Sequence, residues 1–125
     1  MEDFFYRKLL VYQNALLFVK EVYTLTEKFP SVEKHCLTDQ IRRAVISVPS
    51  NIAEGMGRFS IRERIHFLEI ANGSLTETMC QLEIAHLLEY ISDNDLKTTE
   101  EKLTVISRLL GGLKKNFENK MNKSN

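Results

Sequence analysis

The chain has 125 residues, of which 43% are hydrophobic and 27% are charged, and its seventeen basic side chains balance seventeen acidic ones. This length suffices for one domain whose hydrophobic core needs neither disulfides nor metal. The balanced charge excludes the class of proteins that are drawn to nucleic acid or to a membrane by overall charge alone.

Glycine and proline are scarce, with five and two residues, and apolar residues recur three or four positions apart along most of the chain. Both features predict an all-α fold. The two cysteines, Cys36 and Cys80, form no motif and fit a reducing compartment. No signal-like N-terminal segment or membrane-spanning apolar run is present, so we expect a cytoplasmic protein.

The first helix is expected over residues 9–29, where Pro30 ends it because the residue before a proline disfavours helical geometry. Phe18 and two leucines lie beside its apolar stripe and widen the apolar surface. The stripe itself consists of Tyr12, Ala15, Leu16, Val19, Val22 and Tyr23.

The second helix is expected over residues 32–56, with Ser31 as its N-cap and Glu33 in its first turn. Pro49 lies in the middle of this segment. A proline there removes a backbone donor and crowds the carbonyl four residues earlier, so we predict a kink. The apolar face of the helix is formed by Ile41, Val45, Val48, Ile52 and Met56.

The third helix is expected over residues 61–91, because Ser60 and Glu63 match a capping box. It carries two apolar seams, which indicate burial on two sides, either by neighbouring helices or by a partner subunit. The first seam runs through Ile61, Ile65, Leu68, Ala71, Leu75, Met79, Leu82 and Ala85. The second seam runs through Ile70, Gly73, Cys80, Ile84, Leu87 and Ile91.

The fourth helix is expected over residues 93–118, followed by a disordered polar tail over residues 119–125. Four amphipathic helices with short connections predict one domain over residues 1–125, an antiparallel up-down-up-down four-helix bundle.

Two Glu-x-x-His pairs, Glu63 with His66 and Glu83 with His86, resemble the ligand pairs of di-iron bundles. Both pairs lie on the same expected helix, about 30 Å apart along its axis, so they cannot meet at one metal centre. The adjacent His35 and Cys36 point about 100° apart on a helix, which argues against a catalytic dyad. We therefore predict no metal, no cofactor and no enzymatic activity.

Four arginines are candidates for contacts with nucleic-acid phosphates, most of them near the corner between the second and third helices. The alternative is a solvated face with ordinary ion pairs. These arginines are Arg42, Arg58, Arg62 and Arg64.

A second set of polar residues follows helical spacing on the face of the second helix that carries Arg43. Together with one glutamate of the third helix, they suggest a buried network that would fix helix register if fully paired. The members of this expected network are Arg43, Ser47, Asn51, Glu54 and Glu77.

The run Ser47-Val-Pro-Ser-Asn-Ile-Ala-Glu-Gly55, preceded by Gln40-Ile-Arg-Arg43 and followed by Gly57-Arg58, resembles the signature of the 23S rRNA-intervening sequence proteins. Tyr12 stands where that family usually has tryptophan. The resemblance extends over nearly the whole chain, with further matching stretches at Val11–Ala15, Phe29-Pro30, Phe67–Ala71 and Gly73–Leu75.

The resemblance implies a homopentamer of four-helix bundles around a central channel. It also implies kinship with the accessory variability proteins of diversity-generating retroelements, which bind nucleic acid and a reverse transcriptase. Two hypotheses follow. The first is a homo-oligomer that binds RNA or another nucleic acid through the arginines named above. The second is a protein-interaction scaffold, with a partner such as a reverse transcriptase and no direct nucleic-acid contact.

Overall fold

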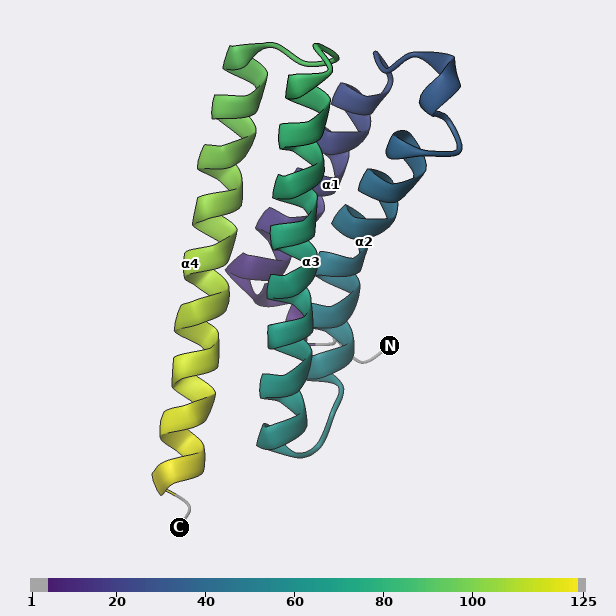
Figure 1. Cartoon of the computed structure of the whole chain (residues 1–125). Coiled ribbons are helices and arrows are strands. Elements are labelled where there is room, and N and C mark those ends of the chain that lie inside the picture. Colours follow the sequence, from purple (N-terminus) through teal and green to yellow (C-terminus); the bar gives the residue numbers. More distant parts are fainter. Residues whose placement is uncertain (1–4, 124–125) are drawn as a thin grey trace.

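The structure is a computed structural model, which describes residues 5–123. These residues form helices and connections only, which confirms the predicted all-α four-helix bundle (Figure 1). The elements follow in the order η1 (Phe5–Lys8), α1 (Leu10–Thr26), η2 (Ser31–Glu33), α2 (Leu37–Met56), α3 (Ile61–Leu87) and α4 (Asp93–Lys123), where η marks a 3-10 helix.

Each long helix packs against two others, in the closed cycle α1–α2–α3–α4–α1. Figure 1 shows that the loop between α1 and α2 and the turn between α3 and α4 lie at one end of the bundle. The turn between α2 and α3 lies at the other end, beside the C-terminal half of α4. Residues far apart in the sequence are therefore brought together at each end.

The core runs along the axis of the bundle and receives large apolar side chains from all four helices. Full burial of one such side chain contributes about 1.5–3 kcal/mol relative to exposure. Among the described residues, the largest of the fully buried side chains are Phe18, Ile41, Ile52, Leu68, Leu75, Leu82 and Ile106. The helices are thus held by one continuous hydrophobic core.

The buried face of α1 is rotated from the predicted stripe. Phe18, which was expected beside the stripe, is only 2% exposed, whereas Leu16 of the stripe is 46% exposed. The observed core positions of this helix are Val11, Ala15, Phe18, Val22 and Leu25. Apolar residues cover so wide an arc of α1 that helical spacing alone does not select which of them face inward.

The connection between α1 and α2 differs from the prediction at both helix ends. The first helix ends at Thr26 rather than at residue 29, and α2 begins at Leu37 rather than at residue 32. The short 3-10 helix η2 occupies the predicted first turn of α2. A carboxylate oxygen of Glu33 accepts a hydrogen bond from the Leu37 N–H at 3.4 Å. Glu33 therefore satisfies a free donor at the start of α2, a task that the sequence suggested for Ser31.

The third helix ends at Leu87 rather than at residue 91, because the chain turns left-handed at Glu89, with φ at 64°. The Glu89 and Tyr90 N–H groups donate to the carbonyls of His86 and Ala85, each at 2.9 Å. This pair of bonds is a Schellman motif, which closes a helix by satisfying its last carbonyls.

The fourth helix continues to Lys123, so the disordered tail predicted from residue 119 is wrong for residues 119–123. Phe117 is buried and fixes the preceding turn to the core. Lysine and glutamate favour helix, and Lys120 and Lys123 complement the negative end of the helix dipole. Residues 124 and 125 of the predicted tail lie outside the described residues.

Pro49 lies inside α2, which is helical on both sides of it, and its side chain is buried. The kink predicted there stays a prediction. Within residues 5–123, no helix is both long enough and apolar enough to cross a bilayer.

Candidate nucleic-acid interface

The turn between α2 and α3 consists of residues 57–60 and is held at both ends. The Arg58 N–H donates to the Gly55 carbonyl at 3.0 Å. The Ser60 hydroxyl accepts from the Glu63 N–H at 3.1 Å, as the predicted cap requires. At Gly55 a Cβ atom would lie only 2.6 Å from the Cβ of Phe67, so α2 and α3 meet more closely there than a side chain would permit. The result is a short, closely supported turn.

Two of the predicted arginines lie at this turn with exposed side chains. The Arg58 guanidinium donates to a carboxylate oxygen of Glu54 at 2.9 Å and lies 4.7 Å from the ring centre of Phe67. Arg62 is exposed and has no hydrogen bond or ion pair with any residue that the structure describes. Arg58 is therefore positioned by its neighbours, whereas the charge of Arg62 is available to a ligand.

Arg64 connects the same turn to two other parts of the chain. Its Nε donates to the Arg58 carbonyl at 2.8 Å. Its guanidinium lies 5.4 Å from the ring centre of Phe5 and 5.6 Å from that of Phe117. Lys120 of α4 lies 5.7 Å from the same Phe117 ring. Arg58, Arg62, Arg64 and Lys120 therefore gather at one end of the bundle, here called the basic end.

Arg42 does not belong to this group. It lies sixteen residues before Arg58, which corresponds to about 24 Å along the helix axis. Its Nε donates to the Thr26 hydroxyl at 2.8 Å, and its guanidinium lies 4.4 Å from the ring centre of Tyr23. Arg42 therefore ties α2 to the end of α1, and the expectation that it shares a surface with the other three arginines is not met.

Of the predicted network around Arg43, only the hydrogen bonds between Ser47 and Asn51 are present. Asn51 donates from Nδ2 to the Ser47 carbonyl and to the Ser47 hydroxyl, each at 2.8 Å. The Ser47 hydroxyl shares a further hydrogen bond of 2.8 Å with the hydroxyl of Ser74 on α3. Ser74 was missed because nothing in the sequence pairs a serine of one helix with a serine of the next.

The charged residues of that expected network pair with other side chains, so the prediction of a single buried network is wrong. The Arg43 side chain is 79% exposed and bonds to Asp39 at 3.1 Å. Glu54 pairs with Arg58, and the exposed Glu77 accepts from Gln81 at 3.2 Å. Helical spacing correctly predicted that these residues lie on helices. It did not predict that their long side chains reach solvent instead of the contact between α2 and α3.

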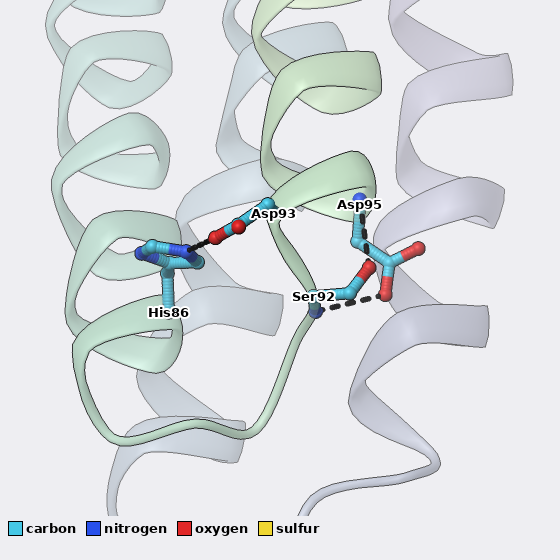
Figure 2. Close-up of polar contacts among 4 residues, drawn as sticks. All are labelled: His86, Ser92, Asp93 and Asp95. Carbon is cyan, nitrogen blue, oxygen red and sulfur yellow. Dashed lines mark hydrogen bonds and ion pairs between the residues drawn. The ribbon is translucent and has the colours of Figure 1, made fainter.

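The turn between α3 and α4 is acidic and contains the only histidine–carboxylate contact among the described residues (Figure 2). His86 Nε2 and Asp93 Oδ1 lie 2.5 Å apart. Ser92 and Asp95 cap α4 reciprocally: the Ser92 N–H donates to Asp95 Oδ2 at 3.2 Å, and the Asp95 N–H donates to Ser92 Oγ at 3.0 Å. No group of three or more potential metal ligands occurs within residues 5–123.

One residue of the basic end was not identified from the sequence. Phe59 lies in the turn between Arg58 and Ser60, and its side chain is fully exposed. A phenylalanine between two apolar helices is expected to be buried, so its residue type did not indicate exposure. The nearest available signal was its position two residues after Gly57, where α2 has already ended.

Comparisons with known proteins agree with this fold. The family model described as 23S rRNA-intervening sequence protein matches residues 7–112. A solved structure of a protein with unknown function, from the S23 ribosomal protein family of Bacteroides thetaiotaomicron, is similar with a TM-score of 0.78 and 27% sequence identity. The similarity covers 85% of this chain and 96% of that chain. No curated protein matches. Since the family model covers most of the sequence, the chain belongs to the 23S rRNA-intervening sequence protein family.

Proposed function

We propose that the protein is a non-enzymatic homo-oligomer that binds RNA or another nucleic acid at the basic end. The observation that carries this proposal is the gathering of cations at one short turn: Arg58 in the turn itself, Arg62 and Arg64 on α3 and Lys120 on α4. Arg62 has no ion pair in the described part of the chain. Phosphate contacts by such side chains supply most of the affinity of non-specific nucleic-acid binding.

Local charge supports the proposal although the net charge is zero. Among the described acidic residues beside the turn, Glu54 is paired with Arg58 at 2.9 Å. The Ser60 cap binds the backbone N–H of Glu63, which places that carboxylate in the first turn of α3. A field from a local cluster acts within about one Debye length, so the basic end can attract a phosphate backbone despite acidic residues at the far end.

A filter-binding titration of RNA across salt concentrations tests this function. Phosphate binding should weaken steeply with salt, and Arg62→Gln should reduce the slope of log affinity against log salt by about one. Arg43→Gln is a matched control, because Arg43 is also an exposed arginine but lies away from the basic end. An affinity too weak to measure even at low salt would refute nucleic-acid binding.

The oligomer is supported by the second seam of α3, which the bundle leaves largely uncovered. Cys80 is exposed, and so are the apolar side chains of Ile70, Ile84 and Leu87, with Leu87 79% exposed. Only Ile91 of that seam is buried within the chain, among the side chains of the core. An apolar row on one face of a helix is typical of a subunit contact. Five subunits is the number that the family resemblance implies.

Light scattering on the purified protein tests assembly, and a strictly monomeric mass at micromolar concentration would contradict it. Ile84→Glu should lower the mass, because it places a charge in the proposed contact. Val32→Glu offers a control, since Val32 is also apolar and is more exposed than Ile84, but lies on η2, away from α3.

A second candidate function, a protein-interaction scaffold without direct nucleic-acid contact, is favoured by a groove of about 640 Å³ between α1 and α4. Leu17, 68% exposed, and Val105 contribute apolar surface to it, and the ion pair between Lys102 and Glu21 at 2.9 Å spans it. A reverse transcriptase is the kind of partner that the resemblance suggests. Leu17→Glu should abolish capture of such a partner while leaving RNA binding unchanged.

A further inference from the structure

Phe59 is the most exposed large apolar side chain of the described residues, with a relative exposure of 101%. Its ring makes no contact with another aromatic ring in residues 5–123, whereas its neighbour Phe67 is covered by the Arg58 guanidinium. An exposed phenyl ring gives up the stabilisation that burial would provide. Phe59 therefore contributes nothing to the fold of the single chain that would explain its presence in this turn.

Phe59 lies between two arginines along the chain, in a turn whose backbone is held at both ends. Arg58 precedes it and is held by Glu54 and by the ring of Phe67. Arg62 follows it in the first turn of α3, where the Ser60 cap fixes the start of the helix. The turn has only four residues and is supported by the close contact at Gly55. An exposed phenyl ring is thus carried by a short, supported turn whose chain neighbours include two exposed arginines, one of them, Arg62, without an ion pair in the described residues.

This arrangement matches the chemistry of unpaired nucleotides. Aromatic side chains bind single-stranded nucleic acid by stacking on bases, while arginines contact the phosphates on either side. In a duplex the bases are covered by their neighbours above and below, so a protruding phenyl ring has no base face to meet. We propose that Phe59, flanked by Arg58 and Arg62, is a stacking site for an unpaired base, and that it directs the protein to single-stranded segments of RNA. This inference rests on the proposed binding of nucleic acid at the basic end.

The test compares two probes, a labelled single-stranded oligoribonucleotide and the same strand annealed into a duplex, by fluorescence anisotropy. Phe59→Ala should weaken binding of the single strand by about 5- to 150-fold, the range that loss of one stacked base produces, and leave duplex binding unchanged. Phe59→Trp should preserve binding of the single strand, because it keeps an aromatic face. Since the Phe59 side chain is exposed, neither variant removes packing from the core.

Val32→Ala is the matched control, because Val32 is also a highly exposed apolar residue but lies on η2, at the opposite end of the bundle and outside the proposed subunit contact. It should leave binding of both probes unchanged. Arg62→Gln should weaken both probes, because phosphates occur in both.

The outcomes separate the two proposals. If the wild-type protein binds neither probe at low salt, the proposed function fails and the stacking site with it. If the wild type binds but Phe59→Ala binds the single strand as tightly as the wild type, or loses equal affinity for both probes, the stacking site alone is refuted. If Phe59→Ala lowers the mass in light scattering, Phe59 is a contact between copies of this chain, and the stacking site is again refuted.

Discussion

The turn between α2 and α3 and the turn between α3 and α4 each end one helix and cap the next, but the side chains around them carry opposite charge. Each starts the following helix with a serine cap, Ser60 in one and Ser92 in the other. The first turn is surrounded by arginines. The second carries Glu89, Asp93 and Asp95, and its one histidine contacts an aspartate. Capping therefore does not require either sign of charge. The arginines at the first turn are not needed for the cap, which is consistent with the proposed binding of phosphates.

The two turns also differ in what holds them. The first depends on shape, since α2 and α3 touch at Gly55 and Phe67. The second depends on polar contacts across the end of the bundle, where the Tyr90 hydroxyl donates to Glu33 Oε2 at 2.8 Å and the Tyr90 ring lies 5.4 Å from that of Phe29. We expect a change of side-chain size to damage the first turn most and a change of pH to affect only the second.

The largest effect is expected for Gly55→Ala. The new Cβ would lie 2.6 Å from the Cβ of Phe67, so the two helices must move apart. Overpacking of this kind costs about 1–3 kcal/mol of unfolding free energy, which urea denaturation measures. Gly111→Ala is the control, because apart from its chain neighbours and the backbone of its own helix no described atom lies within 4 Å of a Cβ added there. It should increase stability by about 0.5–1 kcal/mol. Equal behaviour of the two variants would show that α2 and α3 are not in close contact.

Two adjacent arginines of α2 offer the next test. Arg42→Ala removes a hydrogen bond to Thr26 and a contact with the Tyr23 ring, so it should lower the unfolding free energy by about 1 kcal/mol or more. Arg43→Ala removes only an exposed ion pair with Asp39 and should stay within about 0.5 kcal/mol. A loss of about 3 kcal/mol for Arg43 would instead restore the buried network expected from the sequence.

Glu89→Gly should stabilise the acidic turn. Glu89 adopts a φ of 64°, which glycine adopts without the steric cost that a Cβ imposes. Relief of about 1–2 kcal/mol of steric cost, reduced by the chain entropy of about 0.5–1 kcal/mol that glycine loses on folding, gives an expected net gain of about 0.5–1 kcal/mol in thermal or urea unfolding. Glu89→Ala keeps the Cβ and the strain, so it should show no such gain, and a gain in both variants would point to charge rather than backbone conformation.

The smallest effect is a pH dependence that Tyr90 confers. Its hydrogen bond to Glu33, with burial and the nearby negative charge, raises the pKa of Tyr90 above the ordinary 10.0. The folded state therefore favours the protonated phenol. The stabilisation is complete below the unfolded pKa and is lost as the pH rises through the folded one. The stability difference between the wild type and Tyr90→Phe should stay constant below about pH 9 and shrink as the pH rises above about 10. A constant difference would contradict the hydrogen bond.

The sequence predicted the structural features that depend on the spacing of residues along the chain. The bundle, the order of its helices and the Ser60 cap follow from apolar repeats and local hydrogen-bonding chemistry, which a chain carries within a few residues. It did not predict what depends on neighbours from other helices. Arg42 and Arg64 read as equivalent surface cations, yet one packs on Tyr23 and the other between Phe5 and Phe117. The inward face of α1 and the exposure of Phe59 likewise depend on how the helices meet.

The hydrogen bond between Ser47 and Ser74 joins the middle of α2 to the middle of α3, next to Pro49. Two helices with regular apolar faces can slide past each other by one turn, about 5.4 Å, and still bury most of those faces. Such a slide would separate the two hydroxyls, and it would also bring a residue with a full side chain, such as Asn51, opposite Phe67 in place of Gly55. The serine pair and Gly55 therefore oppose axial sliding of α2 against α3. As a result, the turn that carries Phe59 keeps one position along the axis of the bundle.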